Sequence, residues 1–137
     1  MAATTGGCMC GALRYECTAT PIFMGNCHCR DCQRASGGAY APAIGAPRSA
    51  VKITGDIKYY ESKADSGNMA RRGFCANCGS RLFSLPPFAP DLMVILATSL
   101  DDPSIFKPGM DIYTSSAQAW DHMDPALPKF PKMPPMG

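Results

Sequence analysis

The alternation of apolar and polar residues along this chain predicts short β-strands. In residues 11–17 the side chains of Leu13, Tyr15 and Cys17 fall on one face, because successive side chains of a strand point to opposite sides. Residues 92–97 are apolar throughout, which is typical of a strand buried on both faces. No long amphipathic helical pattern is present, so the expected fold class is all-β.

Weaker patterns predict further short elements along the chain. Two alternating stretches within residues 51–61 flank a Gly-Asp pair, and this arrangement predicts a β-hairpin. Residues 81–83 and 112–114 are each expected to form one short strand. Residues 27–38 contain three cysteines and end in two glycines, which indicates a loop or a single helical turn.

Glycine and proline agree with this description, since the chain of 137 residues contains 13 of each. Both residues favour turns over long helices. A chain of this length is expected to form one domain. We assign that domain to residues 1–124 and treat residues 125–137, which include five prolines, as a tail packed on its surface.

Neither an export signal nor a membrane-spanning segment is apparent. Residues 1–7 lack the basic and apolar parts of a signal peptide, and no run of 18 apolar residues occurs. We therefore expect a cytoplasmic protein, in which cysteine thiols stay reduced.

Seven of the eight cysteines lie in three short clusters with the spacing of metal ligands. The clusters contain Cys8 and Cys10, then Cys27, Cys29 and Cys32, then Cys75 and Cys78. In a reducing compartment such clusters indicate metal binding rather than disulfides. The remaining cysteine, Cys17, belongs to the apolar face of its strand and is expected to be a small core residue.

The spacing divides these cysteines into one closed site and one open site. A C-x-x-C turn supplies half of a tetrahedral zinc site, so the last pair and the first pair together would complete one structural Zn²⁺ site. The middle cluster then offers three thiolates and one exchangeable position, which is typical of a catalytic zinc. His28 lies between two of these cysteines, so its ring is expected to point away from the metal.

Three thiolate ligands would also limit the chemistry of the open site. They donate charge strongly to Zn²⁺, so activation of water is disfavoured and exchange of a soft substrate thiolate is favoured. Purely structural zinc at both sites is the alternative. Seven thiolates and two Zn²⁺ ions would change the formal charge from +2 to about −1, which argues against nucleic acid as a partner.

Three stretches carry these cysteines together with distinctive neighbours: residues 7–15 (GCMCGALRY), 27–37 (CHCRDCQRASG) and 72–80 (RGFCANCGS). Further stretches follow in order, at residues 99–103, 112–113, Trp120 and 127–128. In this order they resemble the glutathione-dependent formaldehyde-activating enzyme family, which also includes centromere protein V.

The resemblance implies a tent-like, all-β fold of coiled antiparallel sheets held by zinc. It assigns Cys8, Cys10, Cys75 and Cys78 to a structural Zn²⁺, and Cys27, Cys29 and Cys32 to a catalytic one. The implied activity is carbon–sulfur bond formation, in which glutathione adds to formaldehyde and gives S-hydroxymethylglutathione. The protein would then be a zinc-dependent carbon–sulfur lyase whose substrates are a small thiol and a small aldehyde.

The implied tripeptide substrate points to further binding residues. Glutathione carries two carboxylates, so Arg34 and the pair Arg71-Arg72 are candidates to bind them. Gly37 and Gly38 would let backbone N–H groups approach the substrate, and Trp120 would wall the pocket. Surface exposure is the alternative for the arginines, and anchoring of the tail is the alternative for Trp120.

Two other residues could transfer protons. They are Asp31, inside the metal loop, and His122, beside Trp120. The simpler interpretations are that Asp31 caps the loop and that His122 is exposed to solvent.

Three functional hypotheses remain open at the level of sequence. The first is addition of a glutathione-like thiol to formaldehyde or a related aldehyde. The second is chemistry on another carbonyl or thiol compound without glutathione, because one fold can serve different substrates. The third is a non-catalytic zinc-binding module. The open three-cysteine site favours the first two hypotheses. We expect no nucleic acid and no membrane as partner, and a homo-oligomer remains possible.

Overall fold

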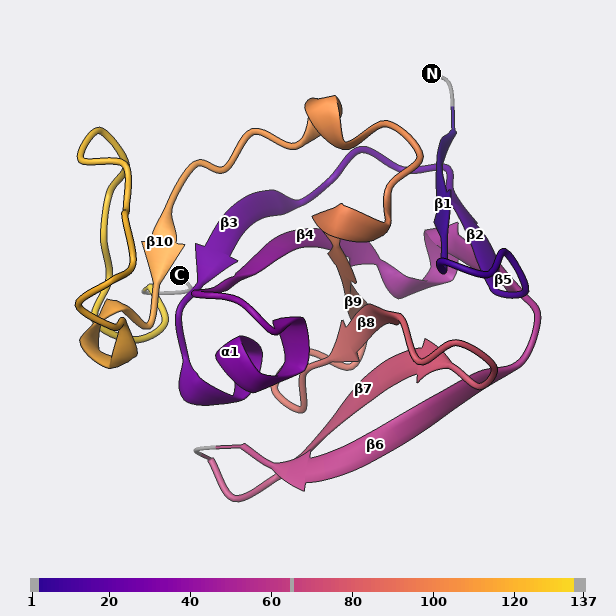
Figure 1. The fold of residues 1–137 in the computed structure, drawn as a ribbon, viewed down its shortest axis with the longest axis horizontal. Helices are drawn as coiled ribbons and strands as arrows, with labels where there is room; N and C mark the ends of the chain where they lie inside the picture. The colour runs from indigo at the N-terminus through magenta and orange to yellow at the C-terminus, as the bar shows by residue number, and fades with distance from the viewer. Residues whose placement is uncertain (1–2, 65, 135–137) are drawn as a thin grey trace.

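The computed structural model describes residues 3–64 and 66–134. Its strands form two sheets (Figure 1). The smaller sheet has the order β1 (Thr4–Gly7), β2 (Arg14–Cys17) and β5 (Val51–Thr54). The larger sheet has the order β10 (Asp111–Ile112), β3 (Phe23–Cys27), β4 (Ala41–Pro47), β9 (Leu92–Leu96), β8 (Arg81–Leu85), β7 (Met69–Cys75) and β6 (Ile57–Lys63).

Neighbouring strands of the described chain run antiparallel, except that β10 is parallel to β3. One α-helix, α1 (Arg30–Ser36), connects β3 to β4. Short 3-10 turns occupy Arg48–Ala50, Ala97–Ser99, Pro103–Ile105 and Thr114–Ser116. The protein is therefore mostly β, as the sequence predicts.

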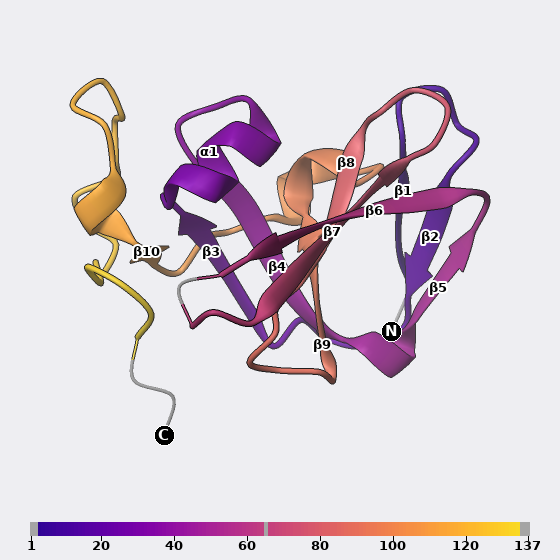
Figure 2. The same cartoon turned by 90° about the horizontal axis from the view of Figure 1, so that it is seen from below.

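The two sheets are joined by one hydrophobic core. In Figures 1 and 2 the smaller sheet lies at one end of the molecule, and residues 113–134, which follow β10, lie at the other end. The ring of Tyr15, from β2, packs edge-on against Phe83, from β8, with 5.1 Å between ring centroids. Leu13 and Cys17 are buried in the same core, which confirms the face predicted for residues 11–17.

β9 runs through the middle of the larger sheet, between β4 and β8. Four of its five residues are buried, so the strand predicted within 92–97 is confirmed. Within β4, Gly45 faces the ring of Phe23, its partner on β3, so closely that a Cβ at this position would overlap the ring. Packing therefore requires glycine at this position of the sheet.

The hairpin predicted for residues 51–61 is wrong. Both strands exist, but β5 pairs with β2 in the smaller sheet, whereas β6 pairs with β7 in the larger sheet. Gly55, with φ of 110°, turns the chain from one sheet to the other. A Cβ on Gly55 would collide with the carbonyl oxygen of Ala12, so this crossing depends on glycine.

The other predicted elements agree with the structure only in part. Residues 27–38 do contain one short helix, and β8 covers the strand predicted at 81–83. The strand predicted at 112–114 stops at Ile112, because Tyr113 takes left-handed backbone angles (φ 56°, ψ 37°) and begins a 3-10 turn. β1, β3, β4 and β7 were not predicted as strands, because their alternation is interrupted by glycine, proline and charged residues.

Residues 128–130 run beside β10. The N–H of Asp111 donates to the carbonyl of Pro128, and the N–H of Phe130 donates to the carbonyl of Asp111, each at 2.9 Å. The division between a domain ending at 124 and a tail remains a prediction. No helix among the described residues has both the length and the apolar character needed to cross a membrane.

Cys17→Ala should cost about 1–2 kcal/mol of unfolding free energy, the usual price of one small buried side chain. Cys17 is only 4% exposed, and its sulfur packs within the core of the two sheets. Chemical denaturation measures the cost, and metal analysis should give the same metal content as the wild type. Loss of a metal equivalent in this variant would show that Cys17 is a ligand.

Candidate functional site

Four cysteines from distant parts of the chain meet beside the smaller sheet. The sulfur atoms of Cys8, Cys10, Cys75 and Cys78 all lie within 4.8 Å of one another. Cys8 and Cys10 follow β1, where the chain leaves strand geometry and turns at Gly11 (φ 81°). Their sulfurs are 3.6 Å apart, and the sulfurs of Cys10 and Cys75 are 3.8 Å apart across 65 residues of sequence.

Backbone N–H groups point at the sulfurs of this cluster. Leu13 donates to the sulfur of Cys8 at 3.2 Å. Asn77 and Cys78 donate to the sulfur of Cys75 at 3.3 and 3.4 Å. Such donors stabilise thiolates, which are the form of cysteine that binds metal.

The dimensions of this cluster fit tetrahedral zinc. Zn–S bonds of about 2.3 Å place two ligating sulfurs about 3.8 Å apart in a tetrahedron. The separations of 3.6 and 3.8 Å agree with that value. The cluster therefore offers a closed set of four sulfur ligands.

The second cluster lies where β3 ends and α1 begins. The sulfurs of Cys27, Cys29 and Cys32 lie within 4.8 Å of one another. Cys27 is the last residue of β3, and Cys29 is the N-cap of α1, whose sulfur accepts the N–H of Cys32 at 3.2 Å. The helix start thus brings the three sulfurs together, and this cluster contains no fourth cysteine among the described residues.

The three sulfurs differ in their affinity for protons. Hydrogen bonds from Cys27 and Cys32 hold the pKa of the Cys29 thiol well below its ordinary value, and the positive charge of Arg72 acts in the same direction. The hydrogen bond with Cys29 raises the pKa of Cys27 above its ordinary value. Negative charge therefore gathers at Cys29, where a bound cation would neutralise it.

His28 turns its ring away from the cluster into a buried polar network. The ring is 0% exposed, with Nδ1 2.5 Å from a carboxylate oxygen of Asp121 and Nε2 2.8 Å from one of Asp111. Lys129 also donates to Asp111, at 3.0 Å, and so does Asn26, at 3.3 Å. Burial opposes the shift, but hydrogen bonds from His28 and Lys129 hold the pKa of Asp111 below its ordinary value.

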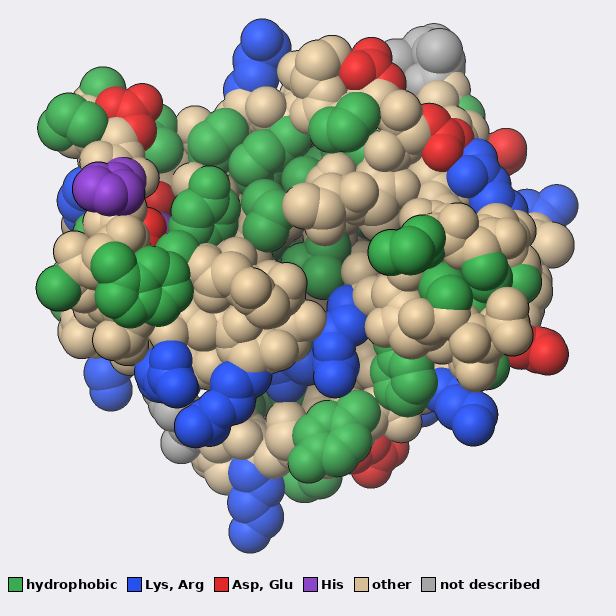
Figure 3. Space-filling model, viewed as in Figure 1, with side chains coloured by type: hydrophobic (Ala, Val, Ile, Leu, Met, Phe, Trp, Pro, Cys, Tyr) green, Lys and Arg blue, Asp and Glu red, His purple; other side chains and the backbone are tan. Residues whose placement is uncertain are grey.

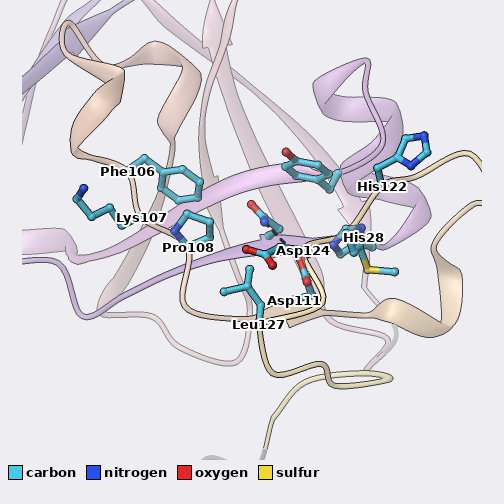
Figure 4. A pocket seen from close by; sticks show the side chains of 11 residues that line it. His28, Phe106, Lys107, Pro108, Asp111, His122, Asp124 and Leu127 are labelled. Carbon is cyan, nitrogen blue, oxygen red and sulfur yellow. Dashed lines mark hydrogen bonds and ion pairs between the residues drawn. The ribbon is translucent and has the colours of Figure 1, made fainter.

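This network borders a hollow of about 440 Å³ that the cysteines do not line (Figure 4). His28 and Asp111 lie at one side of it, and Phe106 and Pro108 lie at the other. His122 also borders it but is exposed, and its ring points away from His28 in Figure 4. The network therefore ties the metal loop to the segment after β10.

Asp111→Asn should lower the unfolding free energy by about 1.5–3 kcal/mol, because it removes a buried carboxylate that accepts hydrogen bonds from Lys129 and Asn26 and contacts His28. Asp111 is 1% exposed and contacts both His28 and Lys129. Asp124→Asn is the matched control, since this neighbouring carboxylate is exposed. The substitution should change the unfolding free energy by less than about 0.5 kcal/mol. Equal denaturation midpoints for the two variants would contradict this role of Asp111.

A separate cavity of about 430 Å³ opens beside the three-cysteine cluster. Cys27, Cys29 and Cys32 line it together with residues of α1, β4, β7, β8 and β9. Figure 3 shows a hollow between the regions of α1 and of β7 and β8, with hydrophobic side chains at its base and Lys or Arg side chains beside it. Among the described residues, no cysteine of the four-sulfur cluster lines this cavity.

The cavity receives only some of the residues expected to bind substrate. Arg72 lines it, whereas Arg34, Gly37, Gly38 and Trp120 do not. Gly37 instead ends α1, with φ of 73° and its N–H closing the last turn. Trp120 is 62% exposed to solvent.

The structure adds Arg30 and Arg81 to the cavity wall. Both lie within three residues of a clustered cysteine, and this proximity is the feature of the sequence that could have indicated them as residues of the site. Arg71 points elsewhere, with Nε 3.3 Å from a carboxylate oxygen of Glu61. Side chains alternate along β7, so only one of the neighbours Arg71 and Arg72 faces the cavity. Asp31 lines the cavity as well.

Fold and site together define a mostly β protein with two cysteine clusters able to hold metal, one of them open to a cavity. The family model described as glutathione-dependent formaldehyde-activating enzyme matches residues 3–116 of this chain. The chain therefore belongs to the glutathione-dependent formaldehyde-activating enzyme family, which confirms the resemblance of its motifs.

A solved structure is similar as well. It is the crystal structure of a Rhodobacter sphaeroides protein that shares 21% sequence identity and has a TM-score of 0.59. The match covers 76% of this chain and 96% of that chain. At this identity the similarity concerns the fold alone.

Proposed function

We propose that the protein is a zinc-dependent enzyme of the carbon–sulfur lyase type, which adds a thiol to formaldehyde or a related small aldehyde. One observation carries this proposal: the three-cysteine cluster lines a cavity, whereas the four-cysteine cluster does not. A site with three protein ligands and access to a cavity is the arrangement typical of catalytic zinc. The family match supports the choice of thiol and aldehyde as reactants.

Two zinc ions per chain fit the two cysteine clusters. When bound by Cys27, Cys29 and Cys32, Zn²⁺ would supply a coordination position for a soft substrate sulfur and favour its thiolate form. The chain itself holds the three sulfurs in place through β3 and the capped start of α1. The cavity walls hold the thiol and the aldehyde next to each other, which lowers the entropic part of the barrier.

The reaction forms one bond from the thiol sulfur to the carbonyl carbon, while the carbonyl π bond breaks. The proton lost by the thiol ends on the new hydroxyl oxygen, so no oxidant or reductant is needed. Asp31 is the only carboxylate among the described residues that line the cavity, and we assign the transfer of this proton to it.

Isotope-exchange NMR with ¹³C-formaldehyde tests the proposal. Protein purified without chelator and shown to contain two zinc ions per chain should accelerate exchange between free formaldehyde and its thiol adduct, beyond the uncatalysed rate. Glutathione is the first thiol to use, and simpler thiols follow. Absence of acceleration with every thiol, in fully metal-loaded protein, would contradict catalysis and favour a zinc-binding module.

A further inference from the structure

The cavity beside the three-cysteine cluster has a largely apolar wall. Leu92, Val94 and Leu96 line it from β9, where their even spacing places them on one face of the strand. Phe83 and Phe88 line it as well. Side chains of this kind favour an apolar ligand over one with several amide groups, because buried amides without partners are costly.

Small side chains give this wall its depth. Ala41 and Ala43, two residues apart on β4, both line the cavity, as does Ala35 of α1. Alanine at these positions leaves room beside the sulfurs, where a larger residue would fill it. The cavity therefore has space for a ligand body as well as for the reacting atoms.

Positive charge is concentrated on the same cavity. Arg30, Arg72 and Arg81 line it, and Asp31 is the one carboxylate among the described residues of its lining. Arg72 donates to the hydroxyl of Ser62 at 3.1 Å, and the guanidinium of Arg81 lies 5.7 Å from the ring of Phe74. None of these three arginines forms an ion pair with a carboxylate in the described part of the chain.

Guanidinium groups that form no ion pair within the described part of the chain, next to an apolar wall, point to an anion attached to an apolar body. We propose that the thiol used at this site is amphipathic: its apolar, aromatic body lies against β9 and Phe88, and its carboxylate pairs with Arg72 and Arg81. This inference rests on the proposed function, because it names the thiol that reacts at the three-cysteine cluster. Glutathione, a tripeptide with two amide groups and an ammonium group, matches such a wall less well.

Calorimetric titration of the zinc-loaded protein tests this inference with three thiols. They are 2-mercapto-3-phenylpropanoate, glutathione and 2-phenylethanethiol, which lacks a carboxylate. The first should bind at least about ten-fold more tightly than glutathione, because a buried phenyl ring is worth that much or more. Its sulfur-free analogue, 3-phenylpropanoate, should still bind and compete with it, since the body of the ligand makes its own contacts.

Variants locate the two halves of the ligand. Arg72→Gln and Arg81→Gln should each weaken binding of the mercaptocarboxylate by about ten-fold, the size of a charge-assisted hydrogen bond, and leave 2-phenylethanethiol unchanged. Phe88→Ala should weaken both aromatic thiols. Arg34→Gln and Tyr60→Ala are matched controls, since these exposed side chains lie outside the cavity wall, and they should change nothing. Thermal melting checks that every variant is folded.

The outcomes separate this inference from the proposed function. If glutathione binds as tightly as the aromatic thiol, or if the arginine variants affect all three thiols equally, the amphipathic substrate is overturned and the enzyme remains. If no thiol binds to the fully loaded protein, the proposed function falls and the inference falls with it. Competition by 3-phenylpropanoate, lost in Phe88→Ala but kept in Tyr60→Ala, supports the apolar half directly.

Discussion

Cys75→Ala should leave the chain unfolded under conditions in which the wild type is folded. Cys75 is 1% exposed and brings the end of β7 to the loop after β1, with its sulfur 3.8 Å from that of Cys10. Structural zinc in finger peptides contributes about 10–16 kcal/mol, which is as large as the total stability of a typical domain, about 5–15 kcal/mol. Loss of one of four ligands forfeits much of this free energy.

Circular dichroism and metal analysis check this result, with Cys17→Ala as the matched control. Both variants remove a buried thiol of the same size, but only Cys75 belongs to a cluster. The control should stay folded and keep its full metal content. If Cys75→Ala has the same melting temperature as the control, the four-cysteine cluster is not required for the stability of this fold.

Cys29→Ser should abolish acceleration of the thiol–aldehyde reaction while the protein stays folded. Cys29 caps α1 by accepting the N–H of Cys32, and serine is among the best residues for that position. The substitution thus preserves the helix start and removes the soft sulfur ligand. The four-cysteine cluster, which lies elsewhere, should keep its ion.

Metal analysis, thermal melting and isotope-exchange NMR follow the effect of Cys29→Ser together. The expected result is loss of one zinc equivalent, a modest change in melting temperature and exchange at the uncatalysed rate. Cys17→Ala should retain both ions and full activity. Unfolding of Cys29→Ser, alongside loss of its metal, would assign a purely structural role to the second cluster.

Short-range spacing explains why the cysteines could be sorted from sequence. Ligands one to five residues apart are brought together by the local turn, so Cys27, Cys29 and Cys32 were recognisable as one group. For the same reason the closely spaced pairs Cys8/Cys10 and Cys75/Cys78 were each recognisable as half of a second group. The same holds for Leu13, Tyr15 and Cys17, because the alternation of a strand is a local property. The all-β class follows from these local signals.

Such local signals do not predict which strands pair with each other. Residues 51–61 contain two good strands around a glycine, yet β5 and β6 belong to different sheets. The choice depends on distant partners, since β5 completes the sheet begun by β1 and β2. A local pattern cannot rank these partners against a simple hairpin.

The residues around the reacting sulfurs were likewise decided by tertiary structure. His28 finds its carboxylate partners 83 and 93 residues away, at Asp111 and Asp121. Arg72 and Arg81 reach the cavity, and Arg34, closer in sequence to the cluster, does not. By itself the sequence determined which side chains can bind metal, because the ligands within each pair or triplet of cysteines are neighbours along the chain. Only the packing of β7, β8 and β9 opposite α1 decided what surrounds the open site, because a cavity is shaped by segments that are distant in sequence.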